Sequence, residues 1–303
     1  KYYLGKFMKN NIQYISVKNN DIFSSDLILK SIKKNKILFI FKDSKNFKKS
    51  LKNIQHDGPA IILESSGSSD RSKLCIHPID NLNKSAESSG IWLKNQGFNL
   101  RECIIFNALP LNHISGFMAL WRSQYWKSEY ISISPDLMKR TKDLIKFSLS
   151  QENINTKKLI TSLVPTQLFR LLNNQYGLDW LKIFDLIWVG GAKLSNDLFE
   201  NCRKEKINLA PCYGATETAA MITSLQPKEF LRGYKNYGRV LKDINVRINN
   251  DGIIEVSSER IGYEIKSPTQ IECFANQNGW WESGDYGKLI KVDNFYYLEV
   301  LGR

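Results

Sequence analysis

The sequence Ser-Ser-Gly-Ser-Ser-Asp-Arg-Ser-Lys at residues 65–73 follows the short apolar run at residues 60–63, with Glu64 between them. Small residues after a buried strand allow backbone N–H groups to turn inward around phosphate oxygens, and the hydroxyls and Lys73 add donors and positive charge. The spacing excludes a Walker A loop, because no Gly-Lys-Ser/Thr follows Gly67 at the required distance. A flexible surface loop is the alternative interpretation of this segment taken alone.

A second polar segment, Tyr-Gly-Ala-Thr-Glu-Thr at residues 213–218, follows a predicted strand as a short loop. The Tyr213 ring suits contact with a purine, and the Thr216 hydroxyl suits a phosphate oxygen. Glu217 offers the carboxylate oxygen that Mg²⁺ takes together with phosphate. A turn with an N-capping threonine is the alternative.

The third segment, Trp-Trp-Glu-Ser-Gly-Asp at residues 280–285, leads to Gly302-Arg303. The two acceptor oxygens of Asp285 suit the paired hydroxyls of a ribose. About 140 residues separate the first two segments and about 65 separate the last two. Each segment alone is compatible with an ordinary polar loop, but three in this order are hard to obtain by accident. Together they predict a nucleotide-binding site.

The composition is that of a globular chain of 303 residues, 42% of them hydrophobic, which suffices for a large core. We find no apolar run near the roughly 18 residues of a membrane span and no secretion signal at residues 1–6, which favours the cytoplasm. The cysteines form no Cys-x-x-Cys pairs, so neither a zinc site nor a disulfide framework is predicted. The net charge of +13 lies in lysines scattered among asparagine and isoleucine, so we expect neither a nucleic-acid partner nor a membrane partner.

Short apolar runs alternate with amphipathic stretches between Pro59 and Cys212. This pattern is typical of an α/β protein with a mostly parallel sheet. N-capping residues or proline predict helices that begin after Ser134, at Pro165 and after Ser195. The predicted strands are 60–63, 103–106, 130–133, 159–163 and 186–189.

Beyond about Arg232 the pattern changes to short alternating runs with turn residues. Strands are predicted at 245–248, 253–256 and 295–300, with a turn at 249–252. These runs predict antiparallel β structure, as a small barrel or a distorted sheet packed on the first part. We therefore expect α/β nucleotide- and acyl-binding subdomains over 1–232 and an antiparallel β subdomain over 233–303.

With these motifs in this order, the chain resembles the large N-terminal domain of the adenylate-forming superfamily, which includes acyl-CoA synthetases, luciferases and peptide-synthetase adenylation domains. Residues 65–73 resemble that family's Thr-Ser-Gly-Thr-Thr-Gly-x-Pro-Lys, residues 213–217 its Tyr-Gly-x-Thr-Glu, and residues 279–285 its Gly-Trp-x-x-Thr-Gly-Asp. Residues 190–192 match a further element beside the adenine and acyl group. The resemblance covers essentially the whole chain and implies parallel sheets flanked by helices plus a smaller antiparallel β subdomain.

The resemblance also implies roles for individual residues. Catalytic roles fall to Lys73, His113, Thr216 and Glu217, with Glu217 as the magnesium ligand. The residues expected to contact ATP are Ser65, Ser66, Gly67, Ser68, Ser69, Lys73, Gly190, Gly191, Ala192, Tyr213, Gly214, Thr216, Asp285 and Arg303. The residues expected to contact the carboxylic acid that such an enzyme activates are His113, Ser115, Gln167, Arg170, Gly191 and Thr218. A satisfied interior histidine is the alternative interpretation of His113.

Within the superfamily, the chain most resembles the o-succinylbenzoate–CoA ligases. The matching stretches are Leu-Pro-Leu-Asn-His-Ile-Ser-Gly at residues 109–116, Ser-Leu-Val-Pro-Thr-Gln-Leu-Phe-Arg-Leu-Leu at residues 162–172, and Val-Gly-Gly-Ala at residues 189–192. The resemblance implies an AMP-forming ligase that uses ATP and Mg²⁺ to activate o-succinylbenzoate and then transfers the acyl group to CoA. Such an enzyme serves menaquinone or phylloquinone biosynthesis.

The implied acid carries two carboxylates, of which one is activated and the other must be recognised. On a helix that starts at Pro165, Gln167 and Arg170 are three residues apart and share a face. A guanidinium binds a carboxylate in bidentate fashion, so Arg170 is the predicted anchor for the second carboxylate. Arg122 is a rival anchor, and a surface arginine is the alternative interpretation of Arg170.

Two features depart from the family pattern. Asp70 replaces the second loop glycine and Ser72 the proline, and a carboxylate near the phosphates weakens ATP binding unless it turns outward or meets Arg71. The family also continues beyond Gly-Arg into a small domain that supplies a lysine for adenylation. Since the 303 residues do not include it, we expect this chain to bind ATP and the acid but to turn over slowly.

The sequence leaves two alternative functions open. In one, the chain adenylates another aryl or acyl acid, with CoA or a carrier protein as acceptor. In the other, it is a nucleotide-binding module without catalysis, for which Asp70 is the motivating residue. The expected partners are the small molecules o-succinylbenzoate, ATP and CoA, and the oligomeric state stays open, with a homodimer as one option.

Overall fold

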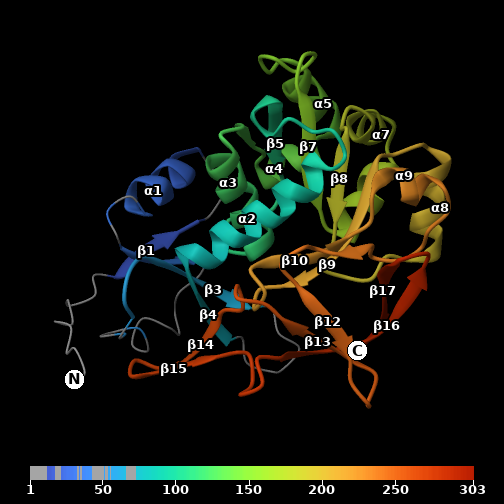
Figure 1. Ribbon diagram of the computed structural model, residues 1–303. Helices are drawn as coiled ribbons and strands as arrows, with labels where there is room; N and C mark the ends of the chain where they lie inside the picture. Colours follow the sequence, from blue (N-terminus) through green and yellow to red (C-terminus); the bar gives the residue numbers. More distant parts are fainter. Residues whose placement is uncertain are drawn as a thin grey trace.

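The computed structural model describes residues 12–17, 22–32, 34, 36–42, 51, 54, 56–65 and 73–303. Its described strands form two sheets (Figure 1). The smaller sheet has six strands in the order β1-β2-β3-β4-β14-β15. These are β1 (Ile12–Ser16), β2 (Ile37–Phe41), β3 (Ala60–Ser65), β4 (Lys73–Pro78), β14 (Tyr263–Ser267) and β15 (Gln270–Cys273). The first three pair in parallel, whereas β4 runs antiparallel to β3 and β14.

The larger sheet has eleven strands in the order β12-β13-β16-β17-β11-β10-β9-β8-β7-β5-β6. They are β5 (Cys103–Asn107), β6 (Glu129–Ser132), β7 (Lys158–Leu163), β8 (Leu186–Val189), β9 (Leu209–Ala215), β10 (Ala220–Ser224), β11 (Arg239–Val240), β12 (Asn245–Ile248), β13 (Ile253–Ser257), β16 (Trp281–Val292) and β17 (Phe295–Gly302). Neighbours from β6 to β9 pair in parallel, and the others are antiparallel. The predicted α/β fold with a largely parallel region is confirmed.

The parallel strands lie where the sequence predicts them because each is a short apolar run between polar turns. Every side chain of β5 and β8 is buried, as expected for strands covered on both faces. Strand β6 begins and ends one residue earlier than predicted. The predicted helix starts are also confirmed, since the Ser134 and Ser195 hydroxyls accept the capping bonds from Leu137 N–H and Leu198 N–H.

Two long helices, α2 (Ile79–Lys94) and α3 (Ile114–Trp126), lie between the sheets. Leu82 of α2 packs with Ile61 of the smaller sheet, whereas Leu93 of the same helix packs with Ile105 of the larger sheet. One layer of helices therefore packs against both sheets.

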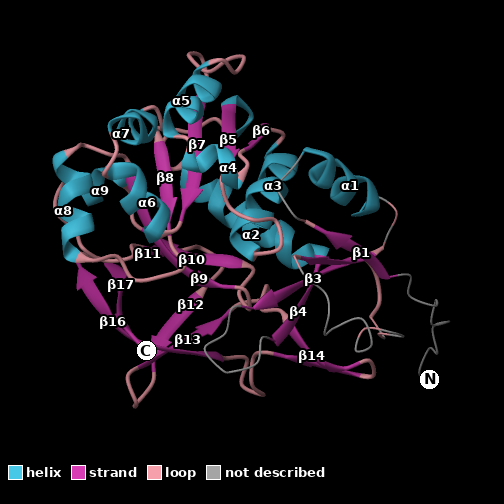
Figure 2. Ribbon diagram, turned by 180° about the vertical axis from the view of Figure 1, so that it is seen from behind, coloured by secondary structure: helices cyan, strands magenta, loops and turns pink. Residues whose placement is uncertain are grey.

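The opposite face of the larger sheet is covered by short helices, four of which lie together at one side in Figure 2 (α6 to α9). Their apolar side chains form one core with the buried faces of β5, β7 and β8. These helices are α4 (Pro135–Lys139), α5 (Thr141–Leu149), α6 (Pro165–Leu172), α7 (Gln175–Lys182), α8 (Asn196–Lys204) and α9 (Pro227–Leu231), and helix α1 (Ile22–Ile32) lies beside β1 and β2. Among the described helices, none combines the length and hydrophobicity needed to cross a bilayer.

The C-terminal strands do not form a small barrel, and they are joined to the strands of the first part rather than packed on it as a distorted sheet of their own. Strand β17 pairs with β11, which continues through β10 into the parallel strands, and β14 pairs with β4 of the smaller sheet. The residues after 232 thus extend both sheets, because the exposed edges of β10 and β4 offer unpaired backbone groups. The division of the chain at residue 232 stays a prediction.

Gly238, between α9 and β11, marks the tightest backbone approach in this region. Its φ is +81°, and a Cβ atom there would lie 2.0 Å from Leu225 N and from the Ser224 carbonyl carbon. We expect Gly238→Ala to lower the free energy of unfolding by about 3 kcal/mol or more, because the backbone of a packed strand must move. Gly233→Ala is the control, since φ is +109° there but nothing lies within 4 Å. Equal losses in urea unfolding would contradict this explanation.

Candidate nucleotide and acid site

The second polar segment is a β-hairpin rather than a loop after a strand. Tyr213, Gly214 and Ala215 belong to β9, and Gly214 pairs with Met221 of β10. A Cβ atom on Gly214 would lie 2.2 Å from the Ala220 carbonyl oxygen, so the hairpin closes only with glycine there. Residues 216–219 form the turn, which presents Thr216 and Glu217 at the end of the hairpin.

This turn is strained and held by its surroundings. Ala219 and Ala220 have φ angles of 51° and 83°, which cost on the order of 1–3 kcal/mol each for residues with a Cβ atom. The fully buried Thr218 hydroxyl accepts a bond from Ala215 N–H at 3.1 Å and donates to the Ala220 carbonyl at 2.8 Å. Ser85 of α2 donates to the Ala219 carbonyl at 2.5 Å. The Thr218 hydroxyl, predicted to contact the acid, is thus engaged within the turn.

Glu217 lies between the two sheets, among groups from several elements. Burial raises the pKa of its carboxyl, and the Ser65 hydroxyl, Lys73 and Arg303 oppose the rise. Its neighbours therefore come from β3, β4 and the residue after β17. A partly buried carboxylate at the end of the turn offers the oxygen ligand that a hard cation shared with phosphate takes.

The third segment contributes a hydrogen-bonded group of three side chains. Asp285, in β16, accepts a bond from Tyr213 Oη at 2.8 Å on one oxygen and from Arg303 Nε at 2.5 Å on the other. Burial beside this carboxylate raises the pKa of the Tyr213 phenol, so the phenol keeps its proton. Each carboxylate oxygen has a second lone pair, so Asp285 retains acceptor capacity for hydroxyl groups.

The Gly190-Gly191-Ala192 segment directly follows β8. Gly190 lies against β9, since a Cβ atom there would be 2.9 Å from the Cys212 carbonyl oxygen and 3.0 Å from Cys212 Sγ. Gly191 has a φ of +85°, a value that glycine adopts without strain. Gly191 and Ala192 are exposed. The segment therefore presents exposed backbone next to β9, and its predicted contact with adenine stays a prediction.

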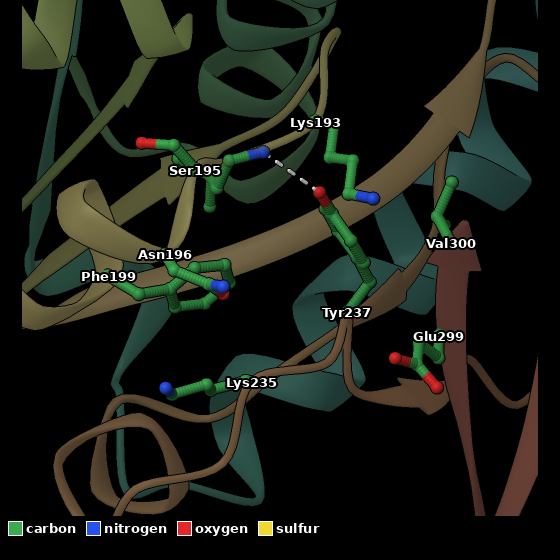
Figure 3. A pocket seen from close by; sticks show the side chains of 9 residues that line it. Lys193, Ser195, Asn196, Phe199, Lys235, Tyr237, Glu299 and Val300 are labelled. Atoms are coloured by element: carbon green, nitrogen blue, oxygen red, sulfur yellow. Dashed lines mark hydrogen bonds between the residues drawn. The ribbon is translucent and has the colours of Figure 1, made fainter. Parts of the chain in front are cut away.

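A cavity of about 530 Å³ lies next to this segment, between the start of α8 and β17 (Figure 3). The dashed line in Figure 3 is the bond from Leu194 N–H to the Tyr237 hydroxyl, 3.1 Å long. The residues that line the cavity are Lys193, Leu194, Ser195, Asn196, Phe199, Lys235, Tyr237, Glu299 and Val300. None of the predicted site residues is among them, although Ala192 and Arg303 lie within three residues of the lining.

The residues predicted to contact the acid fall into an exposed and a bonded group. His113 and Ser115 lie exposed at the start of α3. The Gln167 amide donates to the Ala108 carbonyl at 3.1 Å and accepts from Val164 N–H at 3.1 Å, so both of its ends already serve the loop and the helix cap. Arg170 is exposed on α6, and no partner for its guanidinium is found among the described residues.

Arg122 of α3 lies in a different environment. Its side chain is 2% exposed. Nε donates to Ser89 Oγ at 3.0 Å, the guanidinium carbon lies 5.1 Å from the centre of the Trp188 ring, and Nη2 has no partner among the described residues. Burial lowers the pKa of Arg122 to about 10, so it stays charged at neutral pH. Burying a charge without a counter-ion is costly.

The phosphate-loop residues Ser66, Gly67, Ser68 and Ser69, together with Asp70, Arg71 and Ser72, lie outside the described residues. The two ends of this segment are described and adjacent, because Ser65 of β3 pairs with Lys73 of β4. Lys73 Nζ lies 3.7 Å from a Glu264 oxygen. The predicted roles in this segment stay predictions.

Two buried residues that the sequence analysis did not assign lie behind the hairpin turn. His77 of β4 is fully buried, and its Nε2 lies 2.7 Å from the Thr216 carbonyl oxygen. Arg260 is also fully buried, with Nε 3.2 Å from Asp243 Oδ2 and Nη2 donating to the Met221 carbonyl at 2.6 Å. A period of two along β4 places His77 on the same face as Lys73, which is the sequence signal for His77. Arg260 has no such signal.

The buried His77 should make the folded chain sensitive to acid. Burial lowers its pKa to about 4 from 6.5, and Arg260 acts in the same direction. Between these pH values the unfolded chain binds a proton that the folded chain does not, so stability falls by about 3 kcal/mol as pH drops from 6.5 to 4. We expect His77→Gln to remove this part of the acid dependence. Urea unfolding at pH 7 and at pH 4.5 measures it, and parallel losses in both proteins would contradict the assignment.

Known proteins resemble this chain in sequence and in fold. The model of the family described as "AMP-binding enzyme" matches residues 12–262. A 2-succinylbenzoate–CoA ligase of Geobacillus sp. (strain WCH70) is 28% identical over 80% of this chain and 48% of its own length, and one of Listeria monocytogenes (strain EGD-e) is 30% identical over 79% and 49%.

Among solved structures, the o-succinylbenzoate coenzyme A synthetase of Bacillus subtilis in complex with ATP and magnesium has a TM-score of 0.65 at 21% identity, covering 94% of this chain and 62% of that chain. This likeness shows the fold. The chain spans about half the length of the curated relatives it matches. Because the family model covers most of the chain, this protein belongs to the AMP-binding enzyme family.

Proposed function

We propose that this chain is the ATP- and acid-binding part of a cytoplasmic ligase that activates o-succinylbenzoate as an acyl-adenylate and passes the acyl group to CoA, for menaquinone or phylloquinone synthesis. The curated relatives carry the name of that ligase. Arg122 is the residue that supports an acid with a second carboxylate as the substrate. Its buried guanidinium requires an anionic partner that the described part of the chain does not supply.

Arg122 lies beside Trp188 and near Cys212, which lead into two segments of the predicted site. The guanidinium lies over Trp188, two residues before Gly190, and close enough to Cys212 for the two groups to influence each other's pKa values. Gly190 and Cys212 are themselves in close approach. An acid whose activated carboxylate lies near Thr216 would therefore extend its aromatic ring and second carboxylate toward Arg122.

Arg122 suits this role better than Arg170. A carboxylate bound at a buried site forms hydrogen bonds of higher strength, because water does not compete for the guanidinium. Arg170 is exposed on α6, where an ion pair contributes roughly 0–1 kcal/mol. We therefore propose Arg122 as the anchor of the second carboxylate, with Arg170 as the alternative.

The nucleotide would lie across the two sheets. Thr216 and Lys73 would donate to phosphate oxygens, and Asp285 with Arg303 would bind the ribose beside Gly190, Gly191 and Ala192. Mg²⁺ would be bound by one carboxylate, that of Glu217, and otherwise by phosphates and water. When bound, Mg²⁺ would neutralise charge on the phosphates.

Within this arrangement the protein's own groups would work by positioning and charge. The Thr216 hydroxyl and the Lys73 ammonium would stabilise negative charge that develops on the α-phosphate as the carboxylate attacks. His113, exposed at the start of α3, would lie near the incoming carboxylate. No covalent intermediate with a side chain is needed for this reaction.

The test is calorimetric titration of the chain with o-succinylbenzoate in the presence of Mg²⁺ and a non-hydrolysable ATP analogue. A parallel titration uses the same acid with its side-chain carboxylate esterified. We expect saturable binding of the diacid and binding at least tenfold weaker for the ester. Equal binding of both would favour a different aryl or acyl acid, and binding of the nucleotide alone would favour a module without ligase activity.

A further inference from the structure

His77 of β4 contacts the backbone of Thr216, and Cys75 of the same strand lies 3.9 Å from the same Thr216 carbonyl oxygen. Because a carbonyl oxygen only accepts, Nε2 carries the proton and donates to it over 2.7 Å, across 139 residues of sequence. Cys75 Sγ, two residues earlier on the same strand face, lies 3.1 Å from this nitrogen. The imidazole is therefore a neutral donor of fixed tautomer.

The ring has no room to turn away from this bond. A Cβ atom on Gly262 would lie 2.5 Å from His77 Cε1 and 2.9 Å from Nδ1, so the glycine backbone packs directly on the imidazole. The same Gly262 donates its N–H to the Glu217 carbonyl at 2.8 Å. Two successive carbonyls of the strained turn are thus held by two adjacent segments, since Tyr263 pairs with Ile76 of β4.

Strand β4 also carries Lys73, four residues before His77 and on the same face. Strand β4 therefore carries Lys73, a proposed phosphate contact, at its start and the bond from His77 to the Thr216 carbonyl near its end. A displacement of β4 would move Lys73 and Thr216 together, which keeps the distance between two proposed phosphate contacts constant.

We propose that His77 is a positioning residue for the nucleotide phosphates: its Nε2–H bond to the Thr216 carbonyl fixes the turn that bears Thr216 and Glu217 relative to Lys73. This inference rests on the proposed function. It assigns His77 no contact with ATP. Its effect should therefore appear for ligands that carry phosphates and not for the nucleoside.

The test compares three variants of the chain. His77→Gln places an amide Nε2–H near the position of the imidazole donor, His77→Asn is polar but too short to reach the carbonyl, and His77→Leu fills the space without a donor. Titrations with Mg·ATP and with adenosine, and thermal unfolding, are measured for each. If the His77→Leu variant does not fold, the His77→Asn variant still tests the loss of the donor to the Thr216 carbonyl.

We expect His77→Leu and His77→Asn to bind Mg·ATP roughly tenfold more weakly, His77→Gln to stay within threefold of the unchanged chain, and adenosine binding to be the same in all. Unchanged Mg·ATP binding in the Leu or Asn variant would overturn the inference. So would an equal loss in all three variants, or a parallel loss of adenosine, since either identifies a packing role. Failure of the unchanged chain to bind Mg·ATP would instead overturn the proposed function.

Discussion

The Arg122→Met variant is expected to bind o-succinylbenzoate roughly a hundredfold more weakly than the unchanged chain, because a carboxylate loses its partner in a buried site. The same substitution should leave the unfolding temperature unchanged or raise it. Arg122 is 2% exposed with Nη2 unpartnered among the described residues, and replacing such a charge with an apolar side chain of similar volume is often neutral or stabilising. Calorimetry and thermal unfolding of the same samples measure both effects.

The opposite signs of the two effects make this prediction specific. A variant that merely damages the fold would lose binding and stability together. Arg170→Met is the matched control, since its guanidinium is exposed on α6, and we expect it to change the affinity for the acid less than threefold. A large loss of affinity for the acid in the Arg170 variant, with no loss in the Arg122 variant, would identify Arg170 on α6 as the anchor instead.

The strands of the parallel region could be predicted because each is an isolated apolar run, and the starts of α4, α6 and α8 because capping residues and proline act locally. The β9–β10 hairpin could not. Tyr213, Gly214 and Ala215 read as a polar loop, and their pairing with β10 depends on a glycine that admits the Ala220 carbonyl at close range. The placement of the C-terminal strands in both sheets was missed for a similar reason, since edge pairing leaves no pattern in the sequence of either partner.

Within the site, motifs predicted which segments approach one another, but not the contacts that hold them. The acceptor oxygens of Asp285 and the family resemblance assign Asp285 and Arg303 to the ribose, whereas the bond from Tyr213 to Asp285 spans 72 residues and appears only in the fold. Burial was the quantity that the sequence could not supply. Spacing from Gln167 favours Arg170 and leaves Arg122 as a rival anchor, and only the structure distinguishes an exposed guanidinium from a buried one.

The second prediction concerns Glu217. In the Glu217→Gln variant, single-turnover formation of the acyl-adenylate should fall roughly a hundredfold or more, because the amide does not replace a carboxylate as a ligand of Mg²⁺ and the charge on the phosphates is less well neutralised. The addition of Mg²⁺ should raise the affinity for ATP in the unchanged chain and raise it much less in the variant. Pyrophosphate release after rapid mixing, and ATP titrations with and without Mg²⁺, measure the two effects.

The fold should tolerate this substitution. Burial raises the pKa of Glu217, which means that the folded chain favours the protonated carboxyl and that ionisation at neutral pH costs stability. A neutral amide removes that cost, so the unfolding temperature at pH 7 should stay the same or rise. Glu259→Gln is the control, because Glu259 is exposed and paired with Lys84, and it should leave the rate unchanged. If Glu217→Gln kept the full response to Mg²⁺, the metal would have to be bound by the phosphates without a protein carboxylate, and the role of the strained turn would reduce to holding Thr216.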